Sequence, residues 1–270
     1  MTTFNRELLK QAKRVVVKVG SSTITYANGK RNFSQIDRIA RELSDLQNQG
    51  KEMILVTSGA VAVGVDRLGL PKKPDTIPGK QAAAAVGQGV LMHTYEKIFA
   101  DYGQIVAQVL LTKTESLDRH RYTNSRNTFM ELIKQRVIPI VNENDTVSVK
   151  ELEHVTSFGD NDTLSACVAL ICHADALIIF SDIDGLYDAD PRSNPDAMLI
   201  PVVTELTDEI IACAGGAGTN RGTGGMITKL HAAQIATEAG INTVVMNGSD
   251  PEELYKLIDG RQIGTLFKSR

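Results

Sequence analysis

The sequence contains little cysteine, and its three cysteines are an odd number. In a chain of 270 residues this argues against a disulfide framework. Cys167 and Cys172 stand among apolar residues, where a free thiol packs as a small hydrophobic group. The start of the chain also lacks the apolar segment of a secretory signal. We therefore expect a reducing, cytoplasmic environment.

Long apolar runs and an excess of positive charge are also missing. No run reaches the roughly 18 residues of a membrane span, because His173 and Asp175 interrupt the apolar segment 167–180. Lysine and arginine number 29 against 32 aspartates and glutamates, which gives a net charge of -3. This balance offers no electrostatic attraction for nucleic acid or for an anionic membrane surface. We expect neither as a partner.

Several common site motifs are absent. The chain has no G-x-x-x-x-G-K-[ST] loop and no clear G-x-G-x-x-G turn, the two common phosphate-binding signatures. It has no G-x-S-x-G turn of a serine hydrolase. Its five histidines do not pair with one another or with a cysteine cluster at the spacing of zinc ligands. Hydrolase chemistry and a structural zinc site are therefore not predicted.

The residues that are present predict an α/β fold. Hydrophobic residues make up 42% and charged residues 23% of the chain, which indicates an ordered globular protein. Continuous apolar runs of this length are typical of strands buried on both faces of a parallel sheet. They lie at residues 15–19, 53–57, 104–111, 137–141, 176–180 and 243–246.

Helical spacing of apolar residues alternates with these runs, which predicts a doubly wound α/β sandwich. We expect a helix that is capped by Ser34 and ends before Gly50, and three more over 116–135, 161–173 and 223–239. Pro71, Pro74 and Pro78 predict a loop. We expect one domain, 1–270, made of two lobes that divide near residues 170–175.

Polar or small residues follow four of the expected strands. In open α/β sheets, ligands collect beyond the carboxyl ends of the strands, so four such segments together predict one site along this edge. The four segments are residues 18–22, 57–60, 142–145 and 181–185.

Two lysines stand out as candidate anion-binding groups. Lys18 lies at the end of a run of valines, where an unpaired buried cation is costly, although its side chain could also extend past the strand end into water. Lys229 follows the glycine-rich segment 222–225 at the start of an expected helix. Such a helix start binds anions well, although glycine-rich helix entries are often only structural.

Two acidic segments have a structural and a functional interpretation. Residues 159–162 open a helix and could be no more than a cap, yet three polar side chains exceed what one cap needs. The four aspartates within 181–190 do not fit a calcium loop and could form a solvated turn.

Taken in order, these segments resemble the amino acid kinase family. The motifs that carry the resemblance are VKVGSS at 17–22, VTSGA at 56–60, NEND at 142–145, GDND at 159–162 and GTGGMITK at 222–229. The segment 185–192 and GTLF at 264–267 strengthen it. The match covers the whole chain, and within the family it is most similar to the members that phosphorylate glutamate.

The resemblance implies a three-layer α/β/α fold with a mainly parallel sheet. It implies ATP-dependent phosphorylation, with Mg²⁺, of the γ-carboxylate of L-glutamate to glutamyl 5-phosphate, the first intermediate toward proline. The lobe of about residues 1–172 would hold glutamate and that of about 173–270 would hold ATP. Feedback inhibition by L-proline and a homodimer or homotetramer are also implied. Many such enzymes carry a further carboxyl-terminal domain, which we do not expect after Arg270.

The resemblance also assigns site residues. It places Lys18, Asp162 and Lys229 around the transferred phosphoryl group. It assigns glutamate binding to Ser58, Asp145, Asn161 and Asp160. It assigns nucleotide binding to Lys18, Ser181, Asp182, Thr223, Gly224, Gly225, Met226, Ile227, Thr228 and Lys229. It does not identify the Mg²⁺ ligands.

Two alternatives are weighed against this interpretation. The first is a sibling kinase that acts on N-acetylglutamate, aspartate, carbamate or uridylate. Asp145 argues against N-acetylglutamate, because an acetylated amine gains nothing from a carboxylate. The second is a non-catalytic nucleotide-binding sensor or storage protein, which would not need Lys18, Asp162 and Lys229 together.

Overall fold

The fold is built on a single sheet that runs through the molecule. The computed structural model describes residues 2–112, 118–147, 160–214 and 225–269. Within these residues eight strands pair in the order β3-β4-β2-β1-β5-β7-β8-β6. The strands are β1 (Arg14–Lys18), β2 (Glu52–Val56), β3 (Val106–Leu111), β4 (Ile138–Glu143), β5 (Ala176–Ser181), β6 (Val202–Val203), β7 (Asn242–Asn247) and β8 (Thr265–Phe267).

The pairing of these strands confirms a mainly parallel sheet. Among the described strand pairs, only β7 and β8 run antiparallel. Each of the six apolar runs overlaps a strand that has a parallel neighbour, namely β1, β2, β3, β4, β5 or β7. β1 lies in the middle and pairs with β2 on one side and β5 on the other. The amino-terminal and carboxyl-terminal halves of the chain therefore share one continuous sheet.

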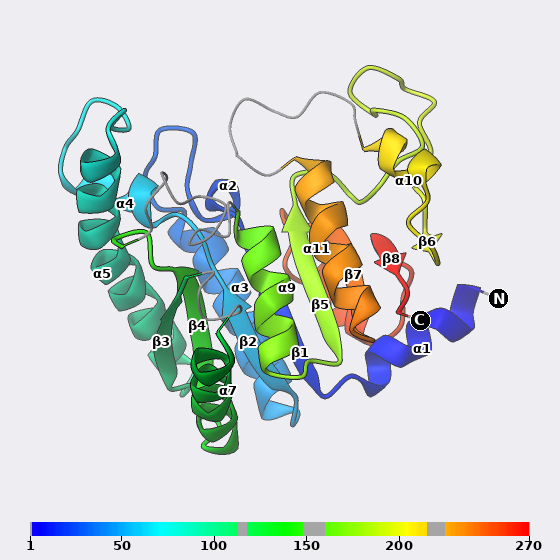
Figure 1. The fold of residues 1–270 in the computed structure, drawn as a ribbon, viewed down its shortest axis with the longest axis horizontal. Helices are drawn as coiled ribbons and strands as arrows, with labels where there is room; N and C mark the ends of the chain where they lie inside the picture. Colours follow the sequence, from blue (N-terminus) through cyan, green and yellow to red (C-terminus); the bar gives the residue numbers. More distant parts are fainter. Residues whose placement is uncertain (1, 113–117, 148–159, 215–224, 270) are drawn as a thin grey trace.

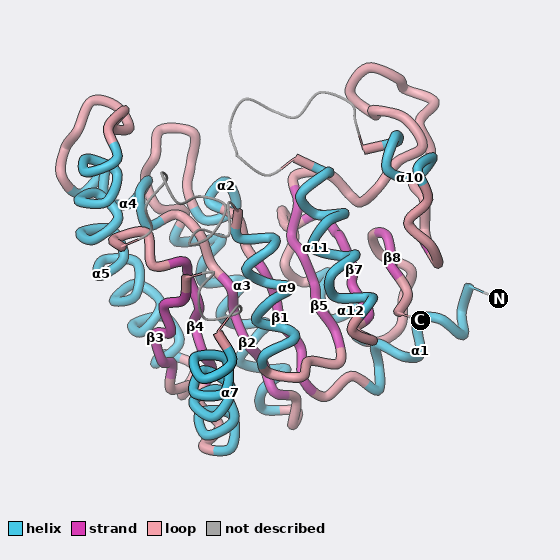
Figure 2. Tube along the Cα trace, viewed as in Figure 1, coloured by secondary structure: helices cyan, strands magenta, loops and turns pink. Residues whose placement is uncertain are grey.

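Helices cover both faces of the sheet and produce three layers (Figures 1 and 2). α3 (Phe33–Asn48), α5 (Ile77–Asp101) and α12 (Glu253–Ile258) pack on one face, and α7 (Arg119–Lys134), α9 (Asn161–Ile171) and α11 (Met226–Glu238) on the other. The remaining helices are α1 (Thr2–Gln11), α2 (Ser21–Ile24), α4 (Ala60–Arg67) and α10 (Asp208–Cys213). The expected α/β/α architecture is confirmed.

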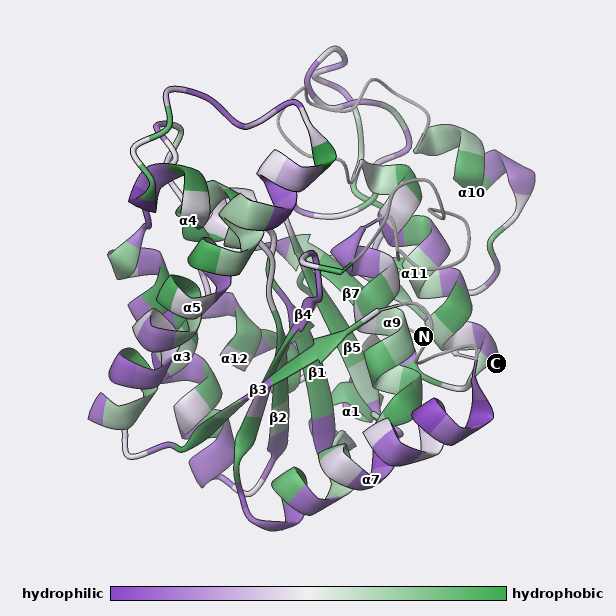
Figure 3. Cartoon of the chain, turned by 60° about the vertical axis from the view of Figure 1, so that its left-hand side comes forward, coloured by the Kyte–Doolittle hydropathy of each residue, from purple (hydrophilic) through white to green (hydrophobic). Residues whose placement is uncertain are grey.

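Each strand contributes to two apolar cores. Val15 and Val17 belong to the core under α3 and α5, whereas Val16 between them belongs to the core under α9 and α11. Alternation along a strand has this effect when both faces are covered. Figure 3 shows the central strands as mostly hydrophobic and the helices as mixed. None of the described helices is both long and apolar enough to span a bilayer.

Two local expectations were wrong. Pro78 does not lie in a loop, because it occupies the first turn of α5, where a missing N–H costs no hydrogen bond. Thr76 caps this helix by accepting a hydrogen bond from the Gly79 N–H. The cap of α3 is Asn32, which accepts from the Gln35 N–H, and not Ser34, which lies inside the helix.

Candidate active site

The strand register brings the predicted polar segments to one edge of the sheet. Lys18, the last residue of β1, lies opposite Val56 of β2 and Ile179 of β5. Val56 in turn lies opposite Val141 of β4. The polar residues that follow these positions therefore emerge side by side at the carboxyl edge, at the top of Figure 1, where α11 also begins.

Lys18, Asp162 and Lys229 meet at this edge. The Lys18 ammonium lies 2.5 Å from Oδ1 of Asp162, and the Lys229 ammonium lies 3.3 Å from Oδ2. Thr228 donates its hydroxyl to the same Oδ2 at 2.8 Å. β1, α9 and α11 thus each supply one member of a junction in which a single carboxylate joins two cations.

The junction is buried and charged. Asp162 is 1% exposed, and the two lysines are 7% and 6% exposed. Burial alone would raise the pKa of Asp162, but the two ammonium groups and the Thr228 hydroxyl outweigh it, so the pKa lies below its ordinary value. Asp162 therefore stays ionised at neutral pH. The three groups carry one net positive charge at the edge of the sheet.

Each polar residue at the start of α9 has its own partner. Asp160 is the cap: its carboxylate accepts from the Thr163 N–H at 2.8 Å and from the Thr163 hydroxyl at 3.2 Å. This bond fixes where the helix begins and so places Asn161 and Asp162 in its first turn. The structure thus confirms the cap, and the other two residues make contacts beyond it.

Asn161 joins three segments of the carboxyl edge. Its Nδ2 lies 2.7 Å from the Thr57 carbonyl, 2.7 Å from Oγ of Ser58 and 2.9 Å from Oδ1 of Asn142. Gly59, which follows Ser58, has a φ of 98° and is the N-cap of α4. This left-handed turn suits glycine and directs the chain away from the sheet edge.

Asn142 and Gln88 belong to the same network. Asn142 lies in the segment 142–145 that was expected at this edge but was assigned no role, and Gln88 was not predicted. Asn142 donates from Nδ2 to Oε1 of Gln88 at 2.9 Å, and both side chains are buried. The position of Asn142 in the NEND motif could have identified it. Gln88 gives a weaker signal: it is a lone amide in the small-residue stretch 82–89 of a helix that was not predicted.

Asp145 lies just beyond β4 beside a second carboxylate. Burial, and after it the charge of Glu143, raise the pKa of Asp145 to about 6, and Lys73 opposes this only in part. A half-buried carboxylate beside another negative charge is suited to bind a cation. The charge at this position is therefore negative, whereas that of the lysine junction is positive.

The remaining predicted residues lie at the ends of β5 and α11. Ser181 is buried, whereas Asp182 is exposed and pairs with Arg192 at 3.0 Å. Gly225 begins α11, Met226 packs against the core and Ile227 is 57% exposed. Thr223 and Gly224 lie outside the described residues.

The described residues include no group of three or more histidine, cysteine, aspartate or glutamate side chains that could hold a metal ion. Asp162 already has two lysine partners, and Asp160 is occupied by its helix cap. This donor set fits a magnesium ion that keeps waters and is bound mainly by the phosphates of a nucleotide. It does not fit a cage made by the protein.

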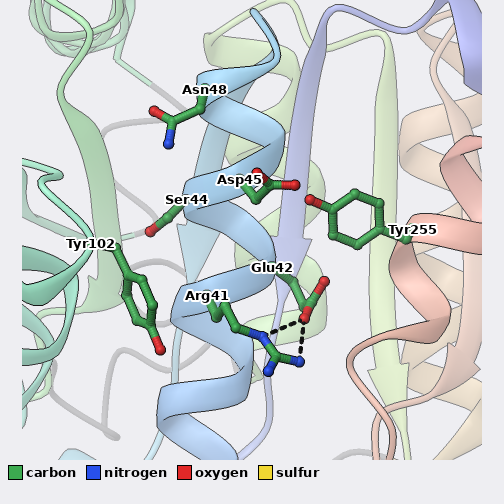
Figure 4. Close-up of a pocket in the computed structure, with 7 residues that line it drawn as sticks. All are labelled: Arg41, Glu42, Ser44, Asp45, Asn48, Tyr102 and Tyr255. Atoms are coloured by element: carbon green, nitrogen blue, oxygen red, sulfur yellow. Dashed lines mark hydrogen bonds and ion pairs between the residues drawn. The ribbon is translucent and has the colours of Figure 1, made fainter.

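A separate hollow lies on α3, between Tyr102 at the end of α5 and Tyr255 of α12 (Figure 4). None of the predicted site residues lines it. Arg41, which does line it, is paired with Glu42 at 2.9 Å and with Glu252 at 2.7 Å. Its charge is therefore already balanced within the protein.

Comparison with known proteins gives consistent matches. The model of a family described as the amino acid kinase family matches residues 13–247. Glutamate 5-kinase of Clostridium tetani is 55% identical over 98% of both chains, and glutamate 5-kinase of Clostridium perfringens is 53% identical over 98% of both. A solved structure, carbamate kinase from Giardia lamblia bound to AMP-PNP, has a TM-score of 0.67 at 15% identity and covers 97% of this chain and 100% of that chain. At this identity the structure supports the fold alone.

Proposed function

The chain belongs to the amino acid kinase family, and from this premise we propose that it transfers the γ-phosphoryl group of ATP to the γ-carboxylate of L-glutamate. The products are glutamyl 5-phosphate, the first intermediate toward proline, and ADP. The observation that carries this proposal is the similarity, along nearly the whole chain, to two glutamate 5-kinases. The lysine junction at the carboxyl edge provides the charge that such a transfer needs.

The chemistry requires charge neutralisation more than proton transfer. The γ-carboxylate is ionised at neutral pH, so one of its oxygens can attack the γ-phosphorus without a general base. The bond to the oxygen that bridges the β- and γ-phosphates breaks, and ADP leaves with that electron pair. The obstacle is that an anion must approach a polyanion, and such transfers depend on positioning and electrostatic stabilisation.

In this proposal Lys18 and Lys229 face the transferred group and its bridging oxygens. Two ammonium groups so close together would repel each other, and Asp162 between them removes that repulsion. Because Asp162 lies in the first turn of α9, and Asp160 caps this helix, the position of both cations is set by the helix start. The junction is thereby preorganised before substrate arrives.

Glutamate would bind along the same edge in the lobe of about residues 1–172. Asp145 suits the α-ammonium group, because its carboxylate lies beside Glu143, and among the described residues the charge of Lys73 offsets this negative charge only in part. Ser58 and Asn161 are neutral: Ser58 follows β2, which lies between β4 and β1 in the sheet, and Asn161 of α9 donates to its hydroxyl oxygen. Asp160 contributes through the position of Asn161.

The nucleotide would bind in the lobe of about residues 173–270, at the ends of β5 and α11. Ser181, Asp182 and the segment 223–229 are the proposed contacts. Mg²⁺, when bound to the ATP phosphates, would neutralise part of their charge. We also propose inhibition by L-proline at an overlapping site, assembly into a homodimer or homotetramer, and a cytoplasmic location, all from similarity to the family.

The test is an ADP-release assay with the purified chain, ATP and Mg²⁺ across a panel of acceptors. L-Glutamate should be the preferred acceptor over N-acetylglutamate, aspartate, carbamate and uridylate. A free α-ammonium group should be required, since Asp145 gains nothing from an acetylated amine. Preference for any other acceptor would contradict the proposal, and absence of transfer to every acceptor would favour a non-catalytic nucleotide-binding protein.

A further inference from the structure

A chain of hydrogen-bonded side-chain amides, with two buried members at its centre, connects α5 with the proposed glutamate site. Gln88 donates from Nε2 to Oε1 of Gln108 at 3.0 Å and accepts from Nδ2 of Asn142 at 2.9 Å. Asn142 accepts in turn from Nδ2 of Asn161 at 2.9 Å. Gln88 is 8% and Asn142 1% exposed, while Gln108 at the far end is exposed.

Two backbone groups fix the direction of this chain. The Glu143 N–H donates to one atom of the Asn142 amide at 2.9 Å, and only the oxygen can accept it. The nitrogen of Asn142 must therefore face Gln88. The Thr57 carbonyl accepts from Asn161 at 2.7 Å, so the nitrogen of Asn161 faces the sheet. The oxygen of Asn161 is thereby left on the opposite side of its amide.

The position of Gln88 is set by the packing of its own helix. Its neighbour Gly87 lies where α5 crosses α4, and a Cβ at that position would be 1.8 Å from the Ala60 carbonyl oxygen. This close approach fixes α5 against the helix that starts directly after Ser58 and Gly59. The same crossing therefore sets the position of Gln88 and of the turn that carries Ser58.

We propose that Gln88 is a positioning residue for the acceptor site: it holds the Asn142 amide, which holds Asn161 with its oxygen toward the substrate. Within the described residues, Gln88 is the acceptor for the Asn142 amide nitrogen. Without it, Asn142 keeps a buried N–H without a partner and turns to satisfy it. Asn161 then loses one of its anchors. This role rests on the proposed function and concerns glutamate, not ATP.

The test compares Gln88→Met, Gln88→Glu and Thr94→Val in steady-state kinetics. Methionine keeps the length but removes the acceptor, and we expect the KM for glutamate to rise at least tenfold while the KM for ATP changes less than twofold. Glutamate at position 88 keeps an acceptor oxygen, and the exposed Gln108 can turn its amide to donate to it. We therefore expect a KM within about threefold of the unaltered chain.

Thr94→Val is the matched control. Thr94 is a buried polar residue on the same helix, 5% exposed, and bonds to Arg31 and to the Val90 carbonyl but not to Asn142. If any disturbance of α5 raised the KM for glutamate, the KM would rise in Thr94→Val too, and that outcome would overturn the role of Gln88. If Gln88→Met does not fold, Gln88→Asn provides the same comparison, because the shorter side chain moves the acceptor oxygen away from Asn142.

The outcomes separate this role from the function itself. If the unaltered chain turns over glutamate and Gln88→Met has the same KM for glutamate, only the role of Gln88 is overturned. Equal losses in Gln88→Met and Gln88→Glu would also overturn it, because the acceptor oxygen would then be irrelevant. Absence of glutamate turnover in the unaltered chain would overturn both.

Discussion

At the scale of single residues, the lysine junction makes the most direct prediction. Replacing Lys229 with alanine removes one of two cations from Asp162 and leaves Lys18 paired. We expect kcat to fall about 10²–10³-fold, the usual effect of deleting one preorganised charge donor. The KM for glutamate should stay within about twofold, because the proposed glutamate-binding residues follow β2 and β4 or lie at the start of α9, and none of them is on α11.

The control for this variant is Lys256→Ala, which removes a half-exposed lysine that pairs with Glu253 on α12. Both variants lose one positive charge, so a difference in kcat between them cannot be caused by the change in net charge. Stopped-time ADP measurements at saturating ATP would give kcat for each. Turnover of Lys229→Ala within tenfold of the unaltered chain would contradict the assigned role.

Asp145 makes a prediction about pH. Its pKa is raised to about 6, so the carboxylate that should bind the α-ammonium group becomes protonated as the pH falls through 6. At pH 5 only about a tenth remains ionised, and the KM for glutamate should be roughly tenfold above its value at pH 8. Steady-state assays between pH 5 and 8 measure this profile.

The corresponding control is Asp145→Asn, which should have a high KM that no longer changes with pH near 6. Protonation of Asp145 is not itself a cause of unfolding. Because the pKa of Asp145 in the folded chain lies above its ordinary value of 3.8, proton uptake at this group below pH 6 favours the folded state. A flat profile in the unaltered chain would exclude Asp145 as the binding group.

At the scale of elements, the crossing of α4 and α5 depends on glycine. Alanine at position 87 would place a methyl group 1.8 Å from the Ala60 carbonyl oxygen, so the helices must separate. We expect the free energy of unfolding to fall by about 3 kcal/mol or more. Urea denaturation followed by circular dichroism measures this loss.

Gly89→Ala is the control on the same helix. Nothing lies within 4 Å of a Cβ at this exposed position, and its φ is not positive. Alanine there should stabilise the protein by about 0.5–1 kcal/mol, because it restricts the unfolded chain and favours the helix. A loss of stability at position 89 as large as at position 87 would show that the crossing is not the cause.

The same two helices show where sequence patterns failed. Buried parallel strands give continuous apolar runs, so β1, β2, β3, β4, β5 and β7 could be predicted from the sequence, whereas the two- and three-residue strands β6 and β8 were too short to give such a run. α5 could not, because it contacts α4 as well as the sheet and carries alanine and glycine on more than one face, without an apolar period. Three nearby prolines favoured a loop, although Pro78 begins the helix.

The candidate site was predictable to a similar, limited extent. Residue types at strand ends indicated the carboxyl edge, and family resemblance indicated which of them belong together. No local pattern could show that Lys18 and Lys229, from opposite ends of the chain, meet at Asp162. Asn142 lay in a segment expected at this edge, but its contact with Gln88 could not be predicted, because the two residues are distant in sequence and are brought together only by the packing of α5.

At the scale of the whole molecule, Arg6 ties the amino terminus to the far edge of the sheet. Its guanidinium donates to the carbonyls of Ile263 at 2.9 Å, Pro201 at 3.0 Å and Gly264 at 3.1 Å. The residue is 2% exposed, and burial lowers its pKa to about 10, so it remains charged at neutral pH.

Arg6→Met should therefore leave three carbonyls without their donor and lower the free energy of unfolding by about 1–3 kcal/mol. This corresponds to a fall in Tm of roughly 3–10 °C, which scanning calorimetry detects. Arg261→Met, at an exposed position near the same edge, should change Tm little. Because Arg6 does not contact the lysine junction, kcat at 25 °C should be retained; a large loss of kcat would contradict a purely stabilising role.

The central position of β1 also constrains how the molecule can be assembled. β1 is followed by its first neighbour, β2, within the next 40 residues or so of the chain, but its other neighbour, β5, begins only at Ala176. During synthesis, therefore, the backbone N–H and C=O groups on one edge of β1 have no strand partner until β5 has been made. Unpaired strand edges of this kind promote aggregation. Ribosome-bound chains that have not yet exposed β5 should accordingly be the ones most dependent on chaperones.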